Sequence, residues 1–93
     1  MDDVRGALAA NLAELRKEEN LTQAEFAARF NYSDKAVSKW ERGDSLPDVV
    51  MLKTIADLYG LRVDDLLTDG GVAAARAERR RGRRARRGRR EQR

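Results

Sequence analysis

The chain has 93 residues, 39% of them charged, and a formal net charge of +4, which is typical of one small, soluble, mildly basic domain. It has no cysteine and no histidine, which excludes disulfides, thiolate zinc sites, Cys or Ser/His nucleophiles and histidine acid–base catalysis. Its apolar runs are far shorter than the roughly 20 residues that cross a bilayer, and Met1 is followed by acidic residues, unlike a secretory signal. We therefore expect a cytoplasmic protein.

The charge is unevenly distributed along the chain. Residues 1–69 hold nine Lys/Arg and fourteen Asp/Glu, a net charge of −5, whereas residues 70–93 hold eleven arginines and two glutamates, a net charge of +9. Apart from alanine, the only apolar residue beyond Asp69 is Val72. Because residues 70–93 bury too little surface to offset the entropy of ordering, the sequence predicts a folded domain followed by a disordered, arginine-rich tail.

Helical spacing of apolar residues predicts two helices in the first third of the chain. The first runs from about residue 3 to residue 19 and carries one apolar stripe of Val4, Leu8, Leu12 and Leu15. The second begins at Thr22, since Thr22-Gln23-Ala24-Glu25 has the pattern of a capping box, and it ends at Asn31, which tolerates a left-handed backbone. Its inner face is Phe26, Ala27 and Phe30.

Three further helices follow. The third, about residues 34 to 42, starts after the N-cap Ser33, stops at Gly43 and turns Ala36, Val37 and Trp40 inward. The fourth has Pro47 near its first turn and ends at Gly60, with a predicted buried stripe of Val49, Leu52, Ile55, Ala56 and Tyr59. The short fifth contributes Val63, Leu66 and Leu67. No stretch shows sustained strand alternation, so the predicted fold is all-α, with five helices.

The second and third helices together have the pattern of a helix-turn-helix. They are short, they are joined by a three-residue turn, and small Ala27 lets them approach at a steep angle. The exposed positions of the third helix are spaced by one, three and four residues, so they project together and could enter a major groove about 12 Å wide. These positions are Asp34, Lys35, Ser38, Lys39 and Arg42.

The order of motifs over residues 8–67 resembles the Cro/repressor-type (XRE) helix-turn-helix family. The run from Asn11 to Ala27 contains L-R-x-x-x-x-L-T-Q-x-x-x-A, residues 38–47 read S-x-W-E-x-G-x-x-x-P, and residues 64–67 read D-x-L-L. The resemblance implies a five-helix, lambda-repressor-like DNA-binding domain with its helix-turn-helix motif at about residues 23–42. Family members are most often repressors that bind operator half-sites as dimers.

The resemblance also implies roles for single residues. Gln23 matches a glutamine that clamps a backbone phosphate, and Lys35 and Lys39 match positions that contact base edges, where lysine suits guanine O6 and N7. Arg16 and Glu41 match an ion pair between the first and third helices. The predicted DNA-binding residues are Thr22, Gln23, Ser33, Asp34, Lys35, Ser38, Lys39 and Arg42, and the predicted structural residues are Arg16, Trp40 and Glu41.

Some of these side chains have a second interpretation. Asp34 could accept from cytosine N4, but it also suits the first turn of a helix as a partner of the helix dipole, which we favour. Trp40 could stack on single-stranded nucleic acid, although its spacing with Ala36 and Val37 favours core packing. Relatives usually carry glycine where this chain has Asn31, so we expect the same turn with slightly lower stability.

The arginine-rich tail admits three interpretations. Arginines four residues apart repel each other, and Gly82 and Gly88 interrupt a helix, hence the expected disorder. The tail could be an electrostatic arm that contacts DNA phosphates or a narrow minor groove, a compositional extension without a specific role, or an RNA-binding segment. Arginines predicted to make non-specific DNA contacts are Arg76, Arg79, Arg80, Arg83, Arg84, Arg86 and Arg87.

The favoured function is therefore a sequence-specific regulator of transcription, a repressor, whose partner is double-stranded DNA and which could bind a palindromic operator as a homodimer. The alternative is the antitoxin of a toxin–antitoxin pair, with the tail bound to a partner protein. Paired carboxylates such as Asp64 and Asp65 are explained by helix starts, so we expect no enzymatic activity. The sequence suggests no metal and no cofactor.

Overall fold

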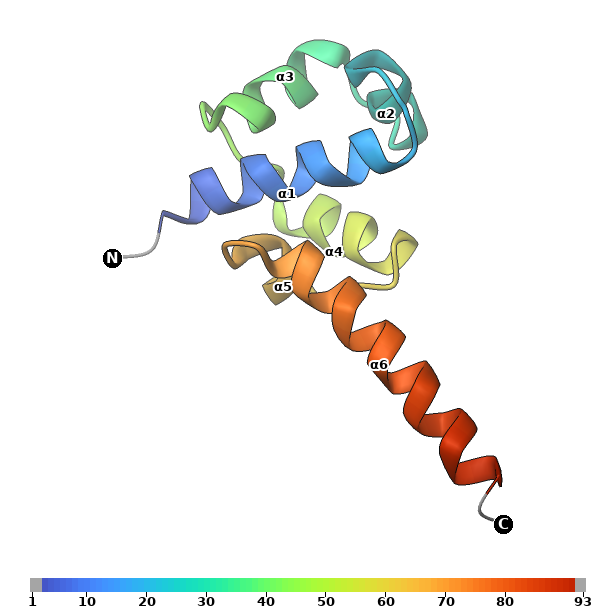
Figure 1. The fold of residues 1–93 in the computed structure, drawn as a ribbon. Helices are drawn as coiled ribbons and strands as arrows, with labels where there is room; N and C mark the ends of the chain where they lie inside the picture. The colour runs from blue at the N-terminus through green and yellow to red at the C-terminus, as the bar shows by residue number, and fades with distance from the viewer. Residues whose placement is uncertain (1–2, 92–93) are drawn as a thin grey trace.

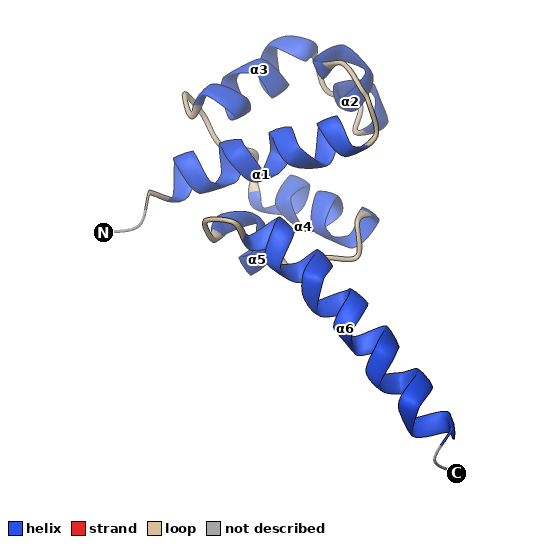
Figure 2. Cartoon of the chain, in the orientation of Figure 1, coloured by secondary structure: helices blue, strands red, loops and turns tan. Residues whose placement is uncertain are grey.

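The computed structural model describes the backbone of residues 3–91 and the side chains of residues 3–81. Helices and short turns account for all of this part, with no strand in residues 3–91, as the all-α prediction requires (Figure 2). The helices are α1 (Val4–Glu18), α2 (Gln23–Arg29), α3 (Asp34–Arg42), α4 (Val49–Leu58), α5 (Val63–Leu67) and α6 (Gly71–Glu91). The described chain thus has one helix more than the five predicted.

Short polar side chains fix the starts of the first four helices. Asp3, Thr22, Ser33 and Asp48 each accept a hydrogen bond from the backbone N–H three residues further on, which satisfies a donor that the helix itself leaves free. At Thr22 the capping box is complete, because its own N–H donates to Glu25 Oε1 at 2.8 Å. The caps therefore set the helix boundaries that the apolar stripes alone define only loosely.

The start of α4 differs from the prediction in which residue it buries. Asp48 is the N-cap, and Pro47 lies just before it and is buried, close to the first turn as expected. Val49, predicted to be buried, is 80% exposed, and Met51 takes its place in the core at 8% exposure. Val4 is likewise exposed at the start of α1. Both valines lie in a first helical turn, beyond the reach of the helices that cover the rest of the stripe.

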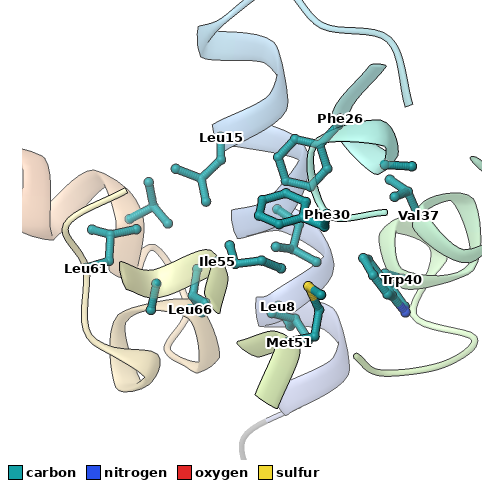
Figure 3. Packing of buried hydrophobic residues seen from close by; sticks show 14 residues of the cluster. Leu8, Leu15, Phe26, Phe30, Val37, Trp40, Met51, Ile55, Leu61 and Leu66 are labelled. Carbon is teal, nitrogen blue, oxygen red and sulfur yellow. The ribbon is translucent and has the colours of Figure 1, made fainter. Parts of the chain in front are cut away.

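The hydrophobic core lies between α1 and the other helices (Figure 3). Leu8, Leu12 and Leu15 of α1 are fully buried, and the rings of Phe26 and Phe30 meet edge to face with centroids 5.1 Å apart. The other buried members are Ala27, Val37, Trp40, Met51, Ile55, Ala56, Leu61, Leu66 and Val72. The apolar stripe of α1 is thus the element around which the other helices are arranged.

The turn between α2 and α3 has the backbone that the sequence predicts. Asn31 has φ 62°, in the left-handed region, and the N–H of Tyr32 donates to Ala27 O at 3.0 Å. A non-glycine residue in this region costs about 1 kcal/mol, which asparagine reduces by its short polar side chain. Four residues, 30–33, connect the two helices, so that α3 begins close to the end of α2.

The predicted disorder of residues 70–93 is wrong for the described part of that segment, which forms α6. Its first turns pack on the domain: Val72 is fully buried and Ala75 is partly buried against the core. The charge repulsion that favoured disorder concerns the later arginines, whereas residues 71–77 are mostly small and apolar. Beyond these turns α6 extends away from α2 and α3 to the far end of the molecule (Figure 1).

Asn11 connects this sixth helix to the rest. It lies on the apolar stripe of α1 with 1% exposure, and its Nδ2 is within 2.8 Å of the carbonyls of both Leu66 and Thr68. Its Oδ1 accepts from the N–H of Val72. One buried amide therefore provides hydrogen-bond partners for carbonyl groups at the end of α5 and for an N–H group at the start of α6.

Candidate nucleic-acid interface

The exposed side of α3 forms a shallow hollow together with the start of α2. Its volume is about 330 Å³, and it is lined by Gln23, Asp34, Lys35, Ser38, Lys39 and Arg42. All six were singled out from the sequence, and the fold brings them to one surface. Three cations and one carboxylate give this hollow a net charge of +2 on a domain that is otherwise acidic.

An ion pair behind the hollow joins α1 to α3. Arg16 donates to both carboxylate oxygens of Glu41, with Nε–Oε2 at 2.8 Å and Nη2–Oε1 at 3.0 Å, so the pair expected from the sequence is present. A third guanidinium hydrogen bond reaches Leu21 O at 2.9 Å. The hydrogen bonds to Glu41 raise the pKa of Arg16 above its ordinary value, so the guanidinium group stays positively charged.

Glu41 also positions Gln23. The Gln23 side-chain amide donates to Glu41 Oε1 at 3.2 Å, so one of its two N–H hydrogens is committed to the ion pair. The second hydrogen remains for an acceptor in front of the hollow, such as a phosphate oxygen. The geometry is therefore compatible with the predicted phosphate contact, and α1 contributes to it through Arg16.

Two hydroxyl groups lie at the helix starts, one residue before Gln23 and Asp34 of the hollow. Thr22 Oγ1 accepts from Glu25 N at 3.1 Å, and Ser33 Oγ accepts from Ala36 N at 3.2 Å. Capping uses a lone pair of each oxygen and leaves its hydrogen available to donate. Both residues can thus cap a helix and donate to a phosphate at once.

The charged residues of α3 differ in how they are held. Lys35 and Lys39 are exposed, as base-contacting side chains require, and Asp34 is exposed in the first helical turn, where its charge suits the helix dipole. Arg42 Nε lies 3.0 Å from Asp44 Oδ2 in an ion pair in which both side chains are more than half exposed. Such a pair contributes at most about 1 kcal/mol, so a phosphate can compete for Arg42.

Trp40 belongs to the core. Its side chain is 4% exposed, and its ring meets that of Tyr32 edge to face at 5.3 Å. The Tyr32 hydroxyl in turn donates to Asp48 Oδ2 at 3.2 Å. The indole therefore helps to hold α3 against the start of α4, and it has no free face for stacking on a base.

The predicted tail arginines fall into three groups. Arg76 and Arg79 are engaged by the domain: Arg76 donates to Tyr59 O and lies 3.3 Å from Glu18, and Arg79 donates to Gly60 O at 2.8 Å. Arg80 is exposed. The side chains of Arg83, Arg84, Arg86 and Arg87 lie outside the part of the structure that is described.

The sequence reasoning missed the residues that fasten the helices behind the hollow. Asn11 occupies a core position of the α1 stripe, one turn from Leu8 and Leu15, and a polar residue at such a position was the available signal. Arg76 and Arg79 donate to the carbonyls that follow the last turn of α4, which has no basic residue of its own. Nothing in the sequence of α4 indicates that these donors come from α6. Their guanidinium groups supply the donors from another helix.

The short α2, its tight turn and the exposed polar side of α3 define a helix-turn-helix protein. The helix-turn-helix family model matches residues 12–66, and the chain belongs to this family, in its XRE type. Residues 3–91 contain no helix both long and apolar enough to cross a membrane. The described side chains contain no group of three or more His, Cys, Asp or Glu that could hold a metal ion.

Curated relatives and a solved structure agree with this family. The chain is 38% identical over 66 residues to the uncharacterized HTH-type transcriptional regulator y4dJ of Sinorhizobium fredii, a match covering 71% of this chain and 86% of that protein. It is 39% identical over 57 residues to the HTH-type transcriptional activator BcrR of Enterococcus faecalis, but spans only 28% of its length. Its fold resembles the clp gene regulator ClgR of Corynebacterium glutamicum, with TM-score 0.62, 28% identity, and 87% and 88% of the two chains covered.

Proposed function

We propose that this chain, by its family a DNA-binding regulator of transcription, recognises a specific operator with α3 in the major groove and represses the adjoining promoter. The observation that carries the proposal is the hollow of about 330 Å³, in which Gln23 and the exposed cations of α3 share one surface. In helix-turn-helix complexes the second helix of the motif contacts base edges, and the start of the first lies against the backbone.

The chemistry of the side chains on this surface indicates which of them contact bases and which contact phosphates. Lys35 and Lys39 are the base-contacting residues, Ser38 lies between them, and Asp34 acts mainly on the helix dipole. Thr22, Gln23, Ser33 and Arg42 contact phosphates and set the position of α3 in the groove. Since the domain itself carries −5, binding depends on this local excess of positive charge and not on a general attraction to polyanions.

Selection of bound sites from random duplexes gives the operator sequence and tests symmetry. A pair of half-sites spaced by one helical turn indicates a homodimer, and a single half-site indicates a monomer. With the operator in hand, in vitro transcription from a promoter that overlaps it tests repression. Reduced transcript supports the proposed direction of regulation, and increased transcript contradicts it.

The substitution Lys39→Ala tests base contact by α3. If Lys39 contacts a guanine, the variant loses about 1–3 kcal/mol of operator binding and loses less affinity for random duplex. The matched control is Lys53→Ala, which removes the same charge from an exposed position of α4 and should leave operator preference unchanged. Competition binding measures both, and an equal loss on operator and random DNA would show that Lys39 only contacts the backbone.

A further inference from the structure

The outer part of α6, residues 80–91, is the most strongly charged segment of the chain. It holds eight arginines and one glutamate, a net charge of +7. Its helix starts on the domain at the buried Val72, and its last turns extend away from α2 and α3 (Figure 1). The arginine positions therefore lie at the opposite end of the molecule from the proposed operator-binding surface.

The inner part of α6 fixes this direction. Arg76 Nη1 donates to Tyr59 O at 3.2 Å, Arg79 Nη2 donates to Gly60 O at 2.8 Å, and Arg76 also pairs with Glu18 at 3.3 Å. Gly60 has φ 66°, and a Cβ there would meet the guanidinium group of Arg79, so its lack of a side chain allows this contact. These bonds hold the helix against the ends of α4 and α1, and from there its backbone extends away from α3 (Figure 1).

The spacing of the arginines indicates the shape of their ligand. From residue 80 onward they occur in pairs separated by single small residues, Gly82, Ala85 and Gly88. Since each residue turns an α-helix by about 100°, the arginine positions are distributed around its whole circumference. A flat anionic surface faces only about half of them, whereas the groove of a double helix has phosphates along both of its walls.

Bound phosphates would also reduce the charge repulsion between the arginines of this helix. Arginines four residues apart, such as Arg80 and Arg84, repel each other along the helix, and a polyanion that neutralises them stabilises the helical form. Each phosphate contact releases a condensed counterion, which favours binding at low salt. The segment has no apolar residue larger than alanine with which to enter a lipid interface or an apolar protein groove.

We propose that residues 80–91 of α6 bind the phosphate backbone of a second DNA duplex while α3 occupies the operator, so that a single chain bridges two DNA segments. The proposal rests on the proposed function for the first of these contacts. It assigns the tail arginines to a different duplex from the one that α3 contacts.

A two-duplex capture assay tests the bridge. An operator duplex is tethered to a surface and saturated with the full chain, and a fluorescent duplex of random sequence is then added in solution. The test variant carries Arg80→Gln, Arg81→Gln, Arg83→Gln, Arg84→Gln, Arg86→Gln and Arg87→Gln, with Arg76 and Arg79 retained. The matched control carries Arg→Lys at the same six positions. Glutamine and lysine are both good helix formers, so only the charge differs between them.

The wild type and the lysine control should retain the random duplex, and the glutamine variant should retain at least about tenfold less while binding the tethered operator equally well. Raising the salt from about 50 to about 200 mM should reduce retention roughly a thousandfold. Capture that survives in the glutamine variant would overturn the proposal, since the bridge would then arise from a dimer.

Two other outcomes would also overturn it. If the glutamine variant loses affinity for the isolated operator duplex and no second duplex is ever retained, the tail contacts the same DNA as α3. If the operator-bound full chain sediments with phosphatidylglycerol vesicles and does not retain the second duplex, the ligand of residues 80–91 is an anionic membrane. Failure of the full chain to bind any selected duplex would instead contradict the proposed function, which separates the two failures.

Discussion

The ion pair between Arg16 and Glu41 connects the stability of the domain to the interface, and the substitution Glu41→Gln tests that connection. Glutamine keeps the size of the side chain but removes the charge that neutralises Arg16. The two side chains are 16% and 8% exposed, so the guanidinium group would be left largely buried without its counter-ion. Gln23 would lose a charged acceptor at the same time.

The magnitude follows from the partial burial. Removing one partner of a fully buried pair costs about 3–5 kcal/mol. Here Arg16 keeps its hydrogen bond to Leu21 O and some contact with water, so we expect a decrease of about 2–3 kcal/mol in the free energy of unfolding. A domain of this size has about 5–15 kcal/mol available, and the variant should stay folded with a lower Tm.

Urea unfolding, followed by the fluorescence of Trp40, measures this loss. A double-mutant cycle with Arg16→Met isolates the pairwise part, which should exceed about 1.5 kcal/mol. A coupling below about 0.5 kcal/mol would refute the reasoning, since that value is typical of an exposed pair. The exposed Lys53–Asp57 pair, at 3.1 Å, is the internal control and should give a coupling in that low range.

Two further predictions concern the helices behind the interface. Asn11→Leu replaces the amide by an apolar side chain and leaves the Leu66 carbonyl and the Val72 N–H without this partner, so the free energy of unfolding should fall by about 3 kcal/mol. Urea unfolding measures the change. A decrease under about 0.5 kcal/mol would show that the hydrogen bonds of Asn11 make no net contribution to stability. Burial and the neighbouring Glu19 raise the pKa of Tyr59 to about 12, so the neutral hydroxyl stabilises the fold fully below pH 10, and this contribution is lost as the pH rises through 12. Tyr59→Phe should flatten the pH dependence of Tm between 10 and 12, and an unchanged slope would assign that dependence to other groups.

The fold and most of the interface could be predicted because they depend on local signals. The capping box at Thr22 and the N-cap at Ser33 fix where two helices begin, and the spacing of the polar positions on α3 fixes which side chains share its free face. Whether those side chains bind DNA remains a prediction. Val49 was placed in the core by its period alone, whereas the N-cap at Asp48 puts it in an open first turn.

What could not be predicted depends on contacts between distant residues. The start of α6 is held by an amide 61 residues earlier in the chain, where Asn11 Oδ1 accepts from Val72 N, and no local pattern reports such a partner. The composition of residues 70–93 favours disorder because it combines little apolar surface with arginines that repel each other and two glycines. The start of α6 is instead attached by the burial of Val72, the amide of Asn11 and the hydrogen bonds of Arg76 and Arg79.

Asn11 and Arg16 lie on the same helix, and this gives α1 a geometric role. The first side chain holds the start of α6 and the second holds the end of α3, at an axial separation of about 7.5 Å. The phase of α1 therefore contributes to the direction of α6, together with the contacts of Arg76 and Arg79 at the end of α4. One residue inserted between Leu12 and Leu15 would turn the two parts of the α1 stripe about 100° out of phase, so the attachments of α6 and α3 could no longer form on the same packed helix.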